Sequence, residues 1–393
     1  MLCIFCVLSN GYALTPLKTT VRSISSPSSL SLQSISLNNK NRIKFCSTGQ
    51  QHLLSTSSDI PINEPSSNQS LPNDQQQLQK QQEQQKGLKQ TLKVGCLFLI
   101  WYALNIGYNL YNKKVLNMVP ELTYTIAFLQ LFLGLIYVIP IWGLNIRKAP
   151  ELTLDEIKTL LPVAALHTLT HIGAVVSLGA GAVSFTHIVK AAEPAVSAFL
   201  SAIFLNQFLP IPVYLSLIPV MGGVAMASLT ELSFTWLSFI SAMISNIASA
   251  ARGIVGKKSM KKPIGKNMNA PNLYAIMTIL SSIATLPLCL LLESQSYKIV
   301  LTKIVNQGLG NILAKQIFLS AIFYYLYNEV AFLTLDNVSP VTHALGNTIK
   351  RVVIIITSVL VFKTKMSLQG VIGSSIAILG VLLYSLTSNH FKK

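Results

Sequence analysis

Charged side chains occur within segments of this sequence that are otherwise almost entirely apolar. The stretch SFTHIVKAAEP (184–194) contains Lys190 and Glu193, three residues apart. Residues at this spacing share one face of a helix, so a local ion pair is the simplest interpretation of these two. A second apolar segment carries Lys350 and Arg351 side by side, with no carboxylate nearby in the sequence. The excess of positive charge favours a binding site for a small dianion.

The segments around these cations are long enough to cross a membrane. The chain has 393 residues, of which 51% are hydrophobic and 11% are charged, less than half the charged fraction of an ordinary soluble protein. A bilayer crossing needs about 20 residues. Ten segments meet this requirement: 94–111, 122–143, 159–179, 182–206, 210–230, 233–252, 272–292, 311–333, 338–362 and 368–387. The sequence therefore predicts an all-α membrane protein with ten transmembrane helices.

The second half of these helices is similar to the first. LIPVMGGVAMASL (217–229) aligns with SSIAILGVLLYSL (374–386) at a shift of 157 residues, and the same shift places 182–206 on 339–363. Because each copy has five helices, an odd number, the copies must enter the membrane from opposite sides. Such inverted repeats place the binding site near the midplane, between the halves. A chance alignment of helices rich in Gly, Ala and Leu is the alternative.

The buried cations determine which ligand fits. Lys190 lies about midway along the fourth predicted span, and Lys350 and Arg351 lie about midway along the ninth. Each cation at the bilayer centre costs at least about 2.5–3.5 kcal/mol, and snorkelling to the surface serves only cations near helix ends. Phosphate matches two ammonium groups and one planar guanidinium. Sulfate and dicarboxylates match the charge count as well.

Two histidines on the third span have the spacing of a zinc pair. His167 and His171 are four residues apart and share a helix face, but no third ligand and no H-E-x-x-H glutamate accompanies them. A histidine that hydrogen bonds to substrate or to another helix is therefore favoured over a metal ligand. We predict no metal and no cofactor.

Further polar residues complete the expected site. Tyr327 offers a hydroxyl from the eighth span. Arg252, at the end of the sixth span, is either a surface anchor or a gating residue. We assign Arg252, Glu193 and His167 to gating or supporting roles.

The first part of the chain differs from the rest in composition. Residues 1–58 contain no Asp or Glu, five Lys or Arg and many Ser and Thr, which is typical of an organelle transit peptide. The apolar start, MLCIFCVLSNGYA, makes a bipartite leader for a plastid with extra membranes a second interpretation. The Gln-rich residues 59–91 are expected to form a disordered linker. The ten-helix membrane domain is expected at 92–388, with halves at about 92–230 and 233–388.

The net charge of +17 lies mostly in loops and tails. This distribution fits a membrane protein better than a nucleic-acid partner. The side that holds both termini carries thirteen Lys or Arg against seven on the other side, which favours termini on the positive-inside face. The five cysteines show no paired framework, so no metal or redox role is expected for them.

Four segments resemble the plastid phosphate translocators of the drug/metabolite transporter superfamily. They are YNKKVLN (111–117), HTLTHIGAVVSLGAGAVSFTHIVKAAEP (167–194), YNEVAFLTLDNVSPVTHALGNTIKRVVII (327–355) and FKTKMS (362–367). The resemblance covers about 92–388 and implies a ten-helix carrier in the inner plastid envelope. Such carriers exchange inorganic phosphate for a phosphorylated sugar or three-carbon acid. The resemblance also implies that Lys190, Lys350 and Arg351 clamp the phosphate and that His171 and Tyr327 contact the substrate.

The resemblance bears on substrate choice. Members selective for phosphoenolpyruvate tend to have asparagine where this chain has His171. Triose-phosphate members usually have Ser or Thr at the position of Ala174, whereas hexose- and pentose-phosphate members have alanine there and are similar to EPAVSA (193–198). We expect exchange of phosphate for triose phosphate or 3-phosphoglycerate by alternating access, with a hexose or pentose phosphate as the alternative.

Two other classes of protein compete with this interpretation. A nucleotide-sugar antiporter of the same superfamily also needs cations, but it resides in secretory membranes and has no need of an acid-free transit peptide. A membrane metalloenzyme that uses His167 and His171 belongs to a different class and would form a product rather than exchange one. We expect a transporter and not an enzyme.

Overall fold

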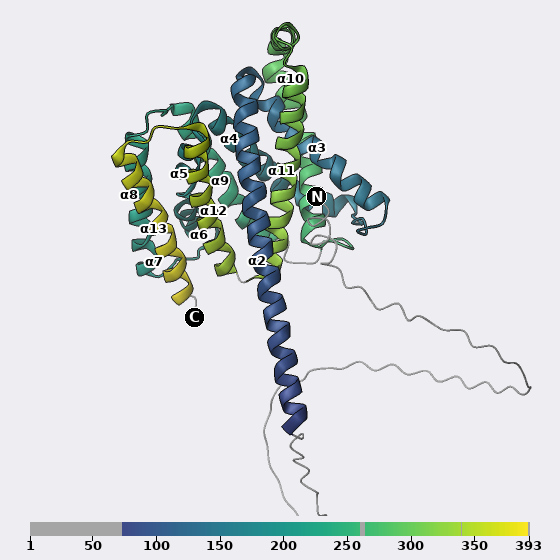
Figure 1. Cartoon of the computed structure of the whole chain (residues 1–393), viewed down its shortest axis with the longest axis vertical. Coiled ribbons are helices and arrows are strands. Elements are labelled where there is room, and N and C mark those ends of the chain that lie inside the picture. Colours follow the sequence, from purple (N-terminus) through teal and green to yellow (C-terminus); the bar gives the residue numbers. More distant parts are fainter. Residues whose placement is uncertain (1–72, 260–263, 339, 392–393) are drawn as a thin grey trace, which may run out of the picture. The chain divides into compact units, whose positions relative to one another are not determined.

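The computed structural model describes residues 73–259, 264–338 and 340–391. These residues form helices joined by loops, and their only β feature is an isolated bridge between Glu151 and Lys266 (Figure 1). The elements are α2 (Asn73–Met118), η1 (Pro120–Leu122), α3 (Thr123–Gly143), α4 (Leu154–Ala180), α5 (Val183–Lys190), α6 (Glu193–Leu205), α7 (Ile211–Leu215), α8 (Leu217–Leu229), α9 (Trp236–Ser259), α10 (Ala270–Asn306), α11 (Gly310–Asn337), α12 (Pro340–Phe362) and α13 (Leu368–His390).

Ten helical segments of the described chain are long and apolar enough to cross a membrane. They are Leu88–Met118, Pro120–Gly143, Leu154–Ala180, Val183–Leu205, Ile211–Leu229, Trp236–Gly256, Ala270–Asn306, Gly310–Asn337, Thr342–Phe362 and Leu368–His390. Each overlaps one of the ten spans predicted from the sequence. The all-α class and the number of spans are confirmed.

The first helix begins further toward the N-terminus than expected. Residues 73–91, which we assigned to a disordered linker, belong to α2. Gln, Glu, Lys and Leu are good helix formers and α2 contains no proline, so the helix starts in this segment and continues into the first span despite Gly87. The predicted leader, 1–58, and residues 59–72 lie outside the described residues.

The fourth span is broken where a single helix was predicted. α5 ends at Lys190, two residues form turns, and α6 begins at Glu193. Pro194 explains the break because it has no N–H to donate to the carbonyl of Lys190, four residues earlier, and its ring clashes with that carbonyl. The break places a cation at the end of one half-helix and a carboxylate at the start of the next.

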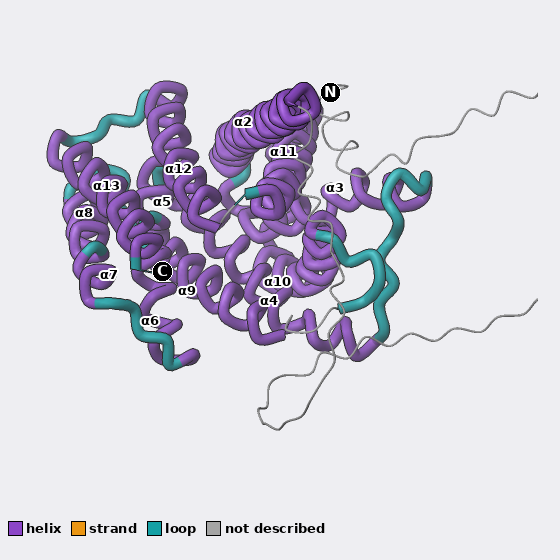
Figure 2. Tube along the Cα trace, turned by 90° about the horizontal axis from the view of Figure 1, so that it is seen from below, coloured by secondary structure: helices purple, strands orange, loops and turns teal. Residues whose placement is uncertain are grey.

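The packing of the spans is consistent with two inverted halves. Three helix pairs join equivalent members of the expected repeats: α3 with α10, α5 with α12, and α8 with α13. Two further contacts correspond to each other under the repeat. In one, α4 of the first half packs on α10, and in the other its counterpart α11 packs on α3, the counterpart of α10. Figure 2 shows α8 and α13 side by side at one end of the bundle. These contacts are those expected if a pseudo-two-fold axis relates the two halves and passes through the three pairs. The inverted repeat itself stays a prediction.

Glycines allow α8 and α13 to come close together. A Cβ on Gly223 of α8 would lie 2.6 Å from the carbonyl oxygen of Gly373, and one on Gly373 would lie 2.7 Å from the nitrogen of Ala227. Gly380 faces Val220 in the same way. Under the 157-residue shift, the pair Gly223–Ala377 corresponds to Gly380–Val220. Small residues at such a crossing permit backbone contact, so packing within the chain accounts for these glycines.

Candidate functional site

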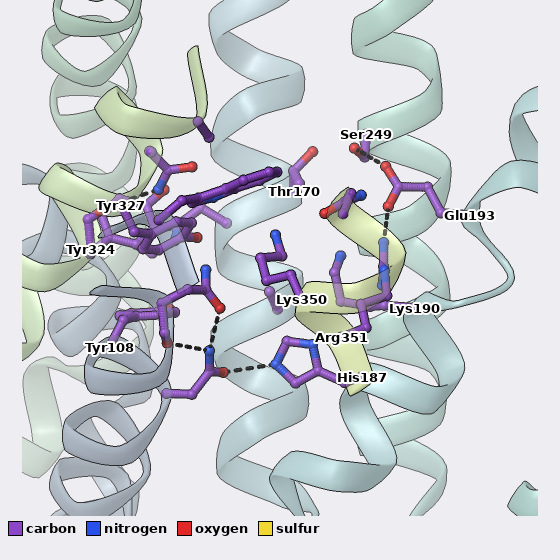
Figure 3. Close-up of a pocket in the computed structure, with 18 of the residues that line it drawn as sticks. Tyr108, Thr170, His187, Lys190, Glu193, Ser249, Tyr324, Tyr327, Lys350 and Arg351 are labelled. Carbon is purple, nitrogen blue, oxygen red and sulfur yellow. Dashed lines mark hydrogen bonds and ion pairs between the residues drawn. The ribbon is translucent and has the colours of Figure 1, made fainter. Parts of the chain in front are cut away.

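A cavity of about 370 Å³ lies among helices of both halves. α2, α4, α5, α6, α9, α11 and α12 contribute side chains to its wall (Figure 3). All nine residues predicted for the site lie in this wall: His167, His171, Ala174, Lys190, Glu193, Arg252, Tyr327, Lys350 and Arg351. The structure thus brings together cations that are about 160 residues apart in the chain.

Glu193 pairs with a cation of the other half. Its carboxylate accepts a hydrogen bond from Arg351 at 2.7 Å and another from the Ser249 hydroxyl at 2.5 Å. The local ion pair expected between Lys190 and Glu193 is therefore replaced by a contact between α6 and α12. The helix break explains this difference because Lys190 and Glu193 no longer share the face of one continuous helix.

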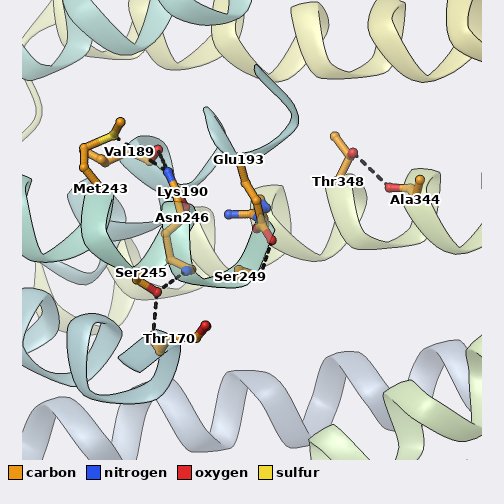
Figure 4. Close-up of polar contacts among 11 residues, drawn as sticks. Thr170, Val189, Lys190, Glu193, Met243, Ser245, Asn246, Ser249, Ala344 and Thr348 are labelled. Atoms are coloured by element: carbon orange, nitrogen blue, oxygen red, sulfur yellow. Dashed lines mark hydrogen bonds and ion pairs between the residues drawn. The ribbon is translucent and has the colours of Figure 1, made fainter. Parts of the chain in front are cut away.

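Lys190 is held by α9. Its Nζ donates to the Ser245 hydroxyl at 2.7 Å, and that hydroxyl donates to the Thr170 carbonyl at 2.8 Å (Figure 4). Gly173 lies where α4 and α9 are in close contact, since a Cβ there would be 2.8 Å from the carbonyl oxygen of Ser241. Close packing of α4 on α9 therefore fixes the hydroxyl that positions Lys190.

Lys350 is held by an aromatic ring. Its Nζ lies 4.7 Å from the centroid of the Trp101 indole, which is 2% exposed. The same indole also stacks on the His343 ring, with 4.9 Å between the ring centroids. Trp101 and His343 were not predicted as site residues, because an aromatic side chain in a membrane span usually serves packing or anchors the helix at the membrane surface.

The cavity carries an excess of positive charge. Its charged lining residues are Lys190, Arg252, Lys350, Arg351 and Glu193. With every group ionised, four positive charges face one negative charge, so the formal sum is +3. A cavity with this charge, in a chain surrounded by lipid, is suited to bind a multiply charged anion.

The two predicted histidines are each engaged by a protein group. His171 Nε2 lies 3.1 Å from the carbonyl oxygen of Ala127, which can only accept, so this nitrogen is the donor. His167 Nδ1 accepts from the Arg252 guanidinium at 2.5 Å. No group of three His, Cys, Asp or Glu side chains with metal-binding geometry occurs in the described ranges. The hydrogen bond to His167 places Arg252 beside this histidine in the cavity wall.

An amide chain fixes the orientation of a third histidine, His187. The Asn109 amide nitrogen donates to the Asn105 carbonyl at 2.8 Å, so Asn109 Oδ1 is left as an acceptor for His187 Nε2, at 2.8 Å. His187 therefore carries its proton on Nε2 when it is neutral. Asn105 and Asn109 were missed, although their spacing of four residues within an apolar span is a signal that they share an inward face.

Tyr327 and Ala174 also lie in the cavity wall, and Figure 3 shows Tyr327 on the opposite side from Glu193. The Tyr327 ring packs against Tyr108 at 5.2 Å and against Tyr324 at 5.7 Å. Tyr324 also lies 4.2 Å from the His171 ring, so this part of the cavity is lined by aromatic rings. Ala174 adds no polar atom of its own side chain. The cavity thus has a cationic part and an aromatic part.

Comparisons with known proteins identify relatives of the chain. The model of the Triose-phosphate Transporter family matches residues 92–385. Glucose-6-phosphate/phosphate translocator 2, chloroplastic, of Arabidopsis thaliana is 41% identical over 297 residues, which are 75% of this chain and 75% of that protein. The chloroplastic triose phosphate/phosphate translocator of Brassica oleracea var. botrytis is 42% identical over 302 residues, or 75% of this chain and 71% of that protein. The corresponding protein of Spinacia oleracea is 41% identical over 303 residues, with coverage of 75% and 72%. The chain, with its ten spans and its cationic cavity, belongs to the Triose-phosphate Transporter family.

Proposed function

We propose that the protein is an antiporter that exchanges inorganic phosphate for a phosphorylated three-carbon metabolite, such as triose phosphate or 3-phosphoglycerate. The observation that carries this proposal is the convergence of Lys190, Lys350 and Arg351 on one cavity between the two halves. Family membership supports transport rather than catalysis. The proposed ligands are inorganic phosphate and a phosphorylated metabolite, which binds through its phosphate group. The lipid bilayer surrounds the ten spans.

Lys190, Lys350 and Arg351 together form the proposed phosphate clamp. Two ammonium groups act as point charges, and the Arg351 guanidinium adds a planar fork of donors. One guanidinium nitrogen, Arg351 Nη2, lies 2.7 Å from Glu193 Oε2, and this ion pair fixes the orientation of the guanidinium. Arg351 Nη1 is buried and has no hydrogen-bond partner among the described residues, which supports its role as a donor to the anion.

The remaining predicted residues serve the rest of the substrate and the movement of the protein. His171 and Tyr327 contact the substrate beyond its phosphate, in the aromatic part of the cavity. Arg252, which is joined to His167, acts at the edge of the site as a gating residue. These roles are proposals that rest on position.

The charge of the cavity also explains exchange. Alternating access passes through an occluded state in which water is excluded, and there an excess charge of +3 is costly. A bound dianion removes most of that charge. The loaded protein therefore changes its orientation more easily than the empty one, and each half-cycle needs an anion.

A hexose or pentose phosphate is a second candidate for the metabolite, and Ala174 favours it. A hydroxyl at this position would supply a hydrogen bond to a short substrate, whereas alanine leaves more room in the cavity wall. The curated relatives include glucose-6-phosphate/phosphate translocators as well as triose phosphate/phosphate translocators, at similar identity.

We also propose that the protein resides in the inner envelope membrane of a plastid. The acid-free residues 1–58 have the composition of a transit peptide, and the relatives named above are chloroplastic proteins. A fluorescent fusion expressed with and without residues 1–58 tests this address. Plastid import of the shortened protein would contradict the role of that segment.

Counter-exchange in liposomes tests the function. Purified protein is reconstituted, and uptake of labelled phosphate is measured against internal phosphate, triose phosphate, 3-phosphoglycerate, phosphoenolpyruvate, xylulose 5-phosphate, glucose 6-phosphate or UDP-glucose. We expect fast uptake against the three-carbon phosphates and little against UDP-glucose. Equal uptake with and without internal phosphate would refute obligatory exchange, and product formation without exchange would favour an enzyme.

A further inference from the structure

We propose that Trp101 holds the Lys350 ammonium while the cavity contains no anion, and that this contact locks the empty protein with α2 against α12. Anion binding withdraws Lys350 from the indole and releases the lock. Trp101 is thus a positioning residue that couples occupancy of the site to movement. The proposal rests on the phosphate exchange proposed above.

The indole that Lys350 contacts is buried, whereas the lysine itself is partly exposed and lines the cavity. Lys350 Nζ lies 4.7 Å from the indole centroid, and Trp101 is 2% exposed. Within the described ranges Lys350 makes no hydrogen bond or ion pair, unlike Lys190 with Ser245 and Arg351 with Glu193. Indole is the aromatic ring that attracts an ammonium most strongly. Trp101 is therefore the group of the described chain that holds the Lys350 ammonium.

The same residue joins the two halves of the molecule. α2 belongs to the first half and α12 to the second. The Trp101 ring stacks on His343 at 4.9 Å with an interplanar angle of 18°. One residue further along α2, the Tyr102 hydroxyl donates to the Gly346 carbonyl at 2.7 Å. The Phe98 ring occupies the space beside Gly346 that a Cβ would need. These contacts seal α2 against α12 beside the cavity.

An anion and the indole compete for Lys350. The face of an aromatic ring carries negative potential, which attracts the ammonium and repels a phosphate dianion. Phosphate is therefore expected to bind on the side of the ammonium that faces away from the indole and to draw the ammonium off the ring toward the cavity. The Ser245 hydroxyl differs because it presents a compact acceptor, and an ammonium has three donors, so Lys190 can keep this bond while it binds phosphate.

The competition explains how the empty carrier is prevented from returning alone. Without an anion, Lys350 stays on Trp101 and α2 stays on α12. With an anion, Lys350 binds the ligand instead of the indole, and the contacts between α2 and α12 are weakened. Two effects thus oppose the return of the empty carrier. One is the cost of an excess charge in the occluded state, and the other is the contact between Trp101 and Lys350.

Leucine at this position tests the lock. Trp101→Leu is compared with Trp101→Phe and with Trp142→Leu, whose indole donates to Asn272 outside the cavity wall. The readout is phosphate uptake into phosphate-free liposomes divided by uptake into phosphate-loaded ones. We expect Trp101→Leu to raise this ratio at least about fivefold and to lower the half-saturating phosphate concentration about tenfold, the scale of a lost cation–π contact with a buried indole. Trp101→Phe should lie between Trp101→Leu and the wild type, and Trp142→Leu should match the wild type.

A purely structural role for Trp101 predicts a different result. Loss of packing would lower the maximal rate, or raise the half-saturating concentration, without increasing uptake into phosphate-free liposomes. An unchanged uptake ratio in a Trp101→Leu protein that still exchanges phosphate would overturn the proposal. Wild-type counter-exchange in the same liposomes is measured first, so a failure of the transport function itself is recognised separately.

Fluorescence of the full chain provides a test that does not depend on the Trp101→Leu variant. The chain has three tryptophans, so Trp142→Phe together with Trp236→Phe leaves Trp101 as the single indole. Titration with inorganic phosphate should change its emission with a saturation curve that matches transport. If this double variant exchanges phosphate and its emission stays constant, Lys350 does not leave the indole and the proposal is wrong.

Discussion

The first half of the molecule presents its cation on a broken helix, whereas the second half presents two cations on the continuous helix α12. Lys190 is the last residue of α5, and Glu193 is the first of α6. A helix C-terminus favours a cation and an N-terminus favours an anion, so the break itself stabilises both charges. Lys350 and Arg351 lie inside α12, where the backbone offers no such help.

The difference explains why the cations of α12 depend on side chains of the first half. Arg351 uses Glu193 of α6, and Lys350 uses Trp101 of α2. Lys190 also reaches across the halves, to Ser245 of α9, but through a hydroxyl that an anion can share. Lys190 is therefore a fixed anchor, Arg351 keeps Glu193 while its free Nη1 meets the anion, and Lys350 is the cation whose partner is proposed to change when the site fills.

Removal of Arg351 should have the largest effect. Arg351→Ala takes one donor group from the anion and leaves the Glu193 carboxylate without its cation in the cavity. Loss of one partner of a buried ion pair typically costs 3–5 kcal/mol, so we expect exchange to fall at least about 100-fold in the liposome assay.

A matched series shows whether this loss comes from the uncompensated carboxylate. The double variant Arg351→Ala with Glu193→Ala should recover part of the phosphate binding lost in Arg351→Ala. Lys158→Ala, which removes an exposed cation with a side chain 72% exposed, should exchange like the wild type. Near-normal transport by Arg351→Ala would show that α12 does not clamp the anion.

Straightening the fourth span should remove the asymmetry between the halves. Pro194→Ala restores a donor to the Lys190 carbonyl, so α5 and α6 can join as one helix. We expect exchange to fall about tenfold because Lys190 loses its place at a helix end, while thermal stability is unchanged or higher. Pro287→Ala, at an in-helix proline of α10 outside the cavity, is the control. Unaltered exchange in Pro194→Ala would mean that the break is not needed for the site.

The hydroxyl that holds Lys190 should affect binding in the opposite direction from Trp101. Ser245→Ala removes an acceptor at 2.7 Å without a competing role, so Lys190 becomes less well positioned. We expect the half-saturating phosphate concentration to rise about threefold to tenfold, the scale of a typical hydrogen bond in a protein. Ser375→Ala, at an exposed hydroxyl of α13, should leave binding unchanged. Tighter binding by Ser245→Ala would erase the distinction between anchor and lock.

A hydroxyl at position 174 should have the smallest effect. Ala174→Ser adds this hydroxyl to the part of the cavity wall that α4 supplies. We expect the preference for triose phosphate over glucose 6-phosphate to increase about fivefold, with little change for inorganic phosphate. Competition of the two metabolites against labelled phosphate measures this ratio. An equal change for all three anions would place residue 174 in contact with the phosphate group rather than with the carbon chain.

Much of the architecture was predictable because it depends on local properties of the chain. Apolar segments of sufficient length specify ten spans, and charges far from helix ends must face a protein interior rather than lipid. Lys190, Lys350, Arg351 and both predicted histidines were therefore identifiable without a structure. Pro194 also marked the helix break, although the fourth span was predicted as one helix.

The pairing of these charges was decided only by the tertiary structure. Spacing in the sequence favoured Lys190 as the partner of Glu193, but the packing of α12 against α5 brings Arg351 to this carboxylate instead. Trp101, Ser245 and Asn109 lie on helices remote in sequence from the groups they contact. Hydrophobic length and desolvation act on each segment by itself, whereas the partner of a buried charge depends on which helices come within hydrogen-bond distance.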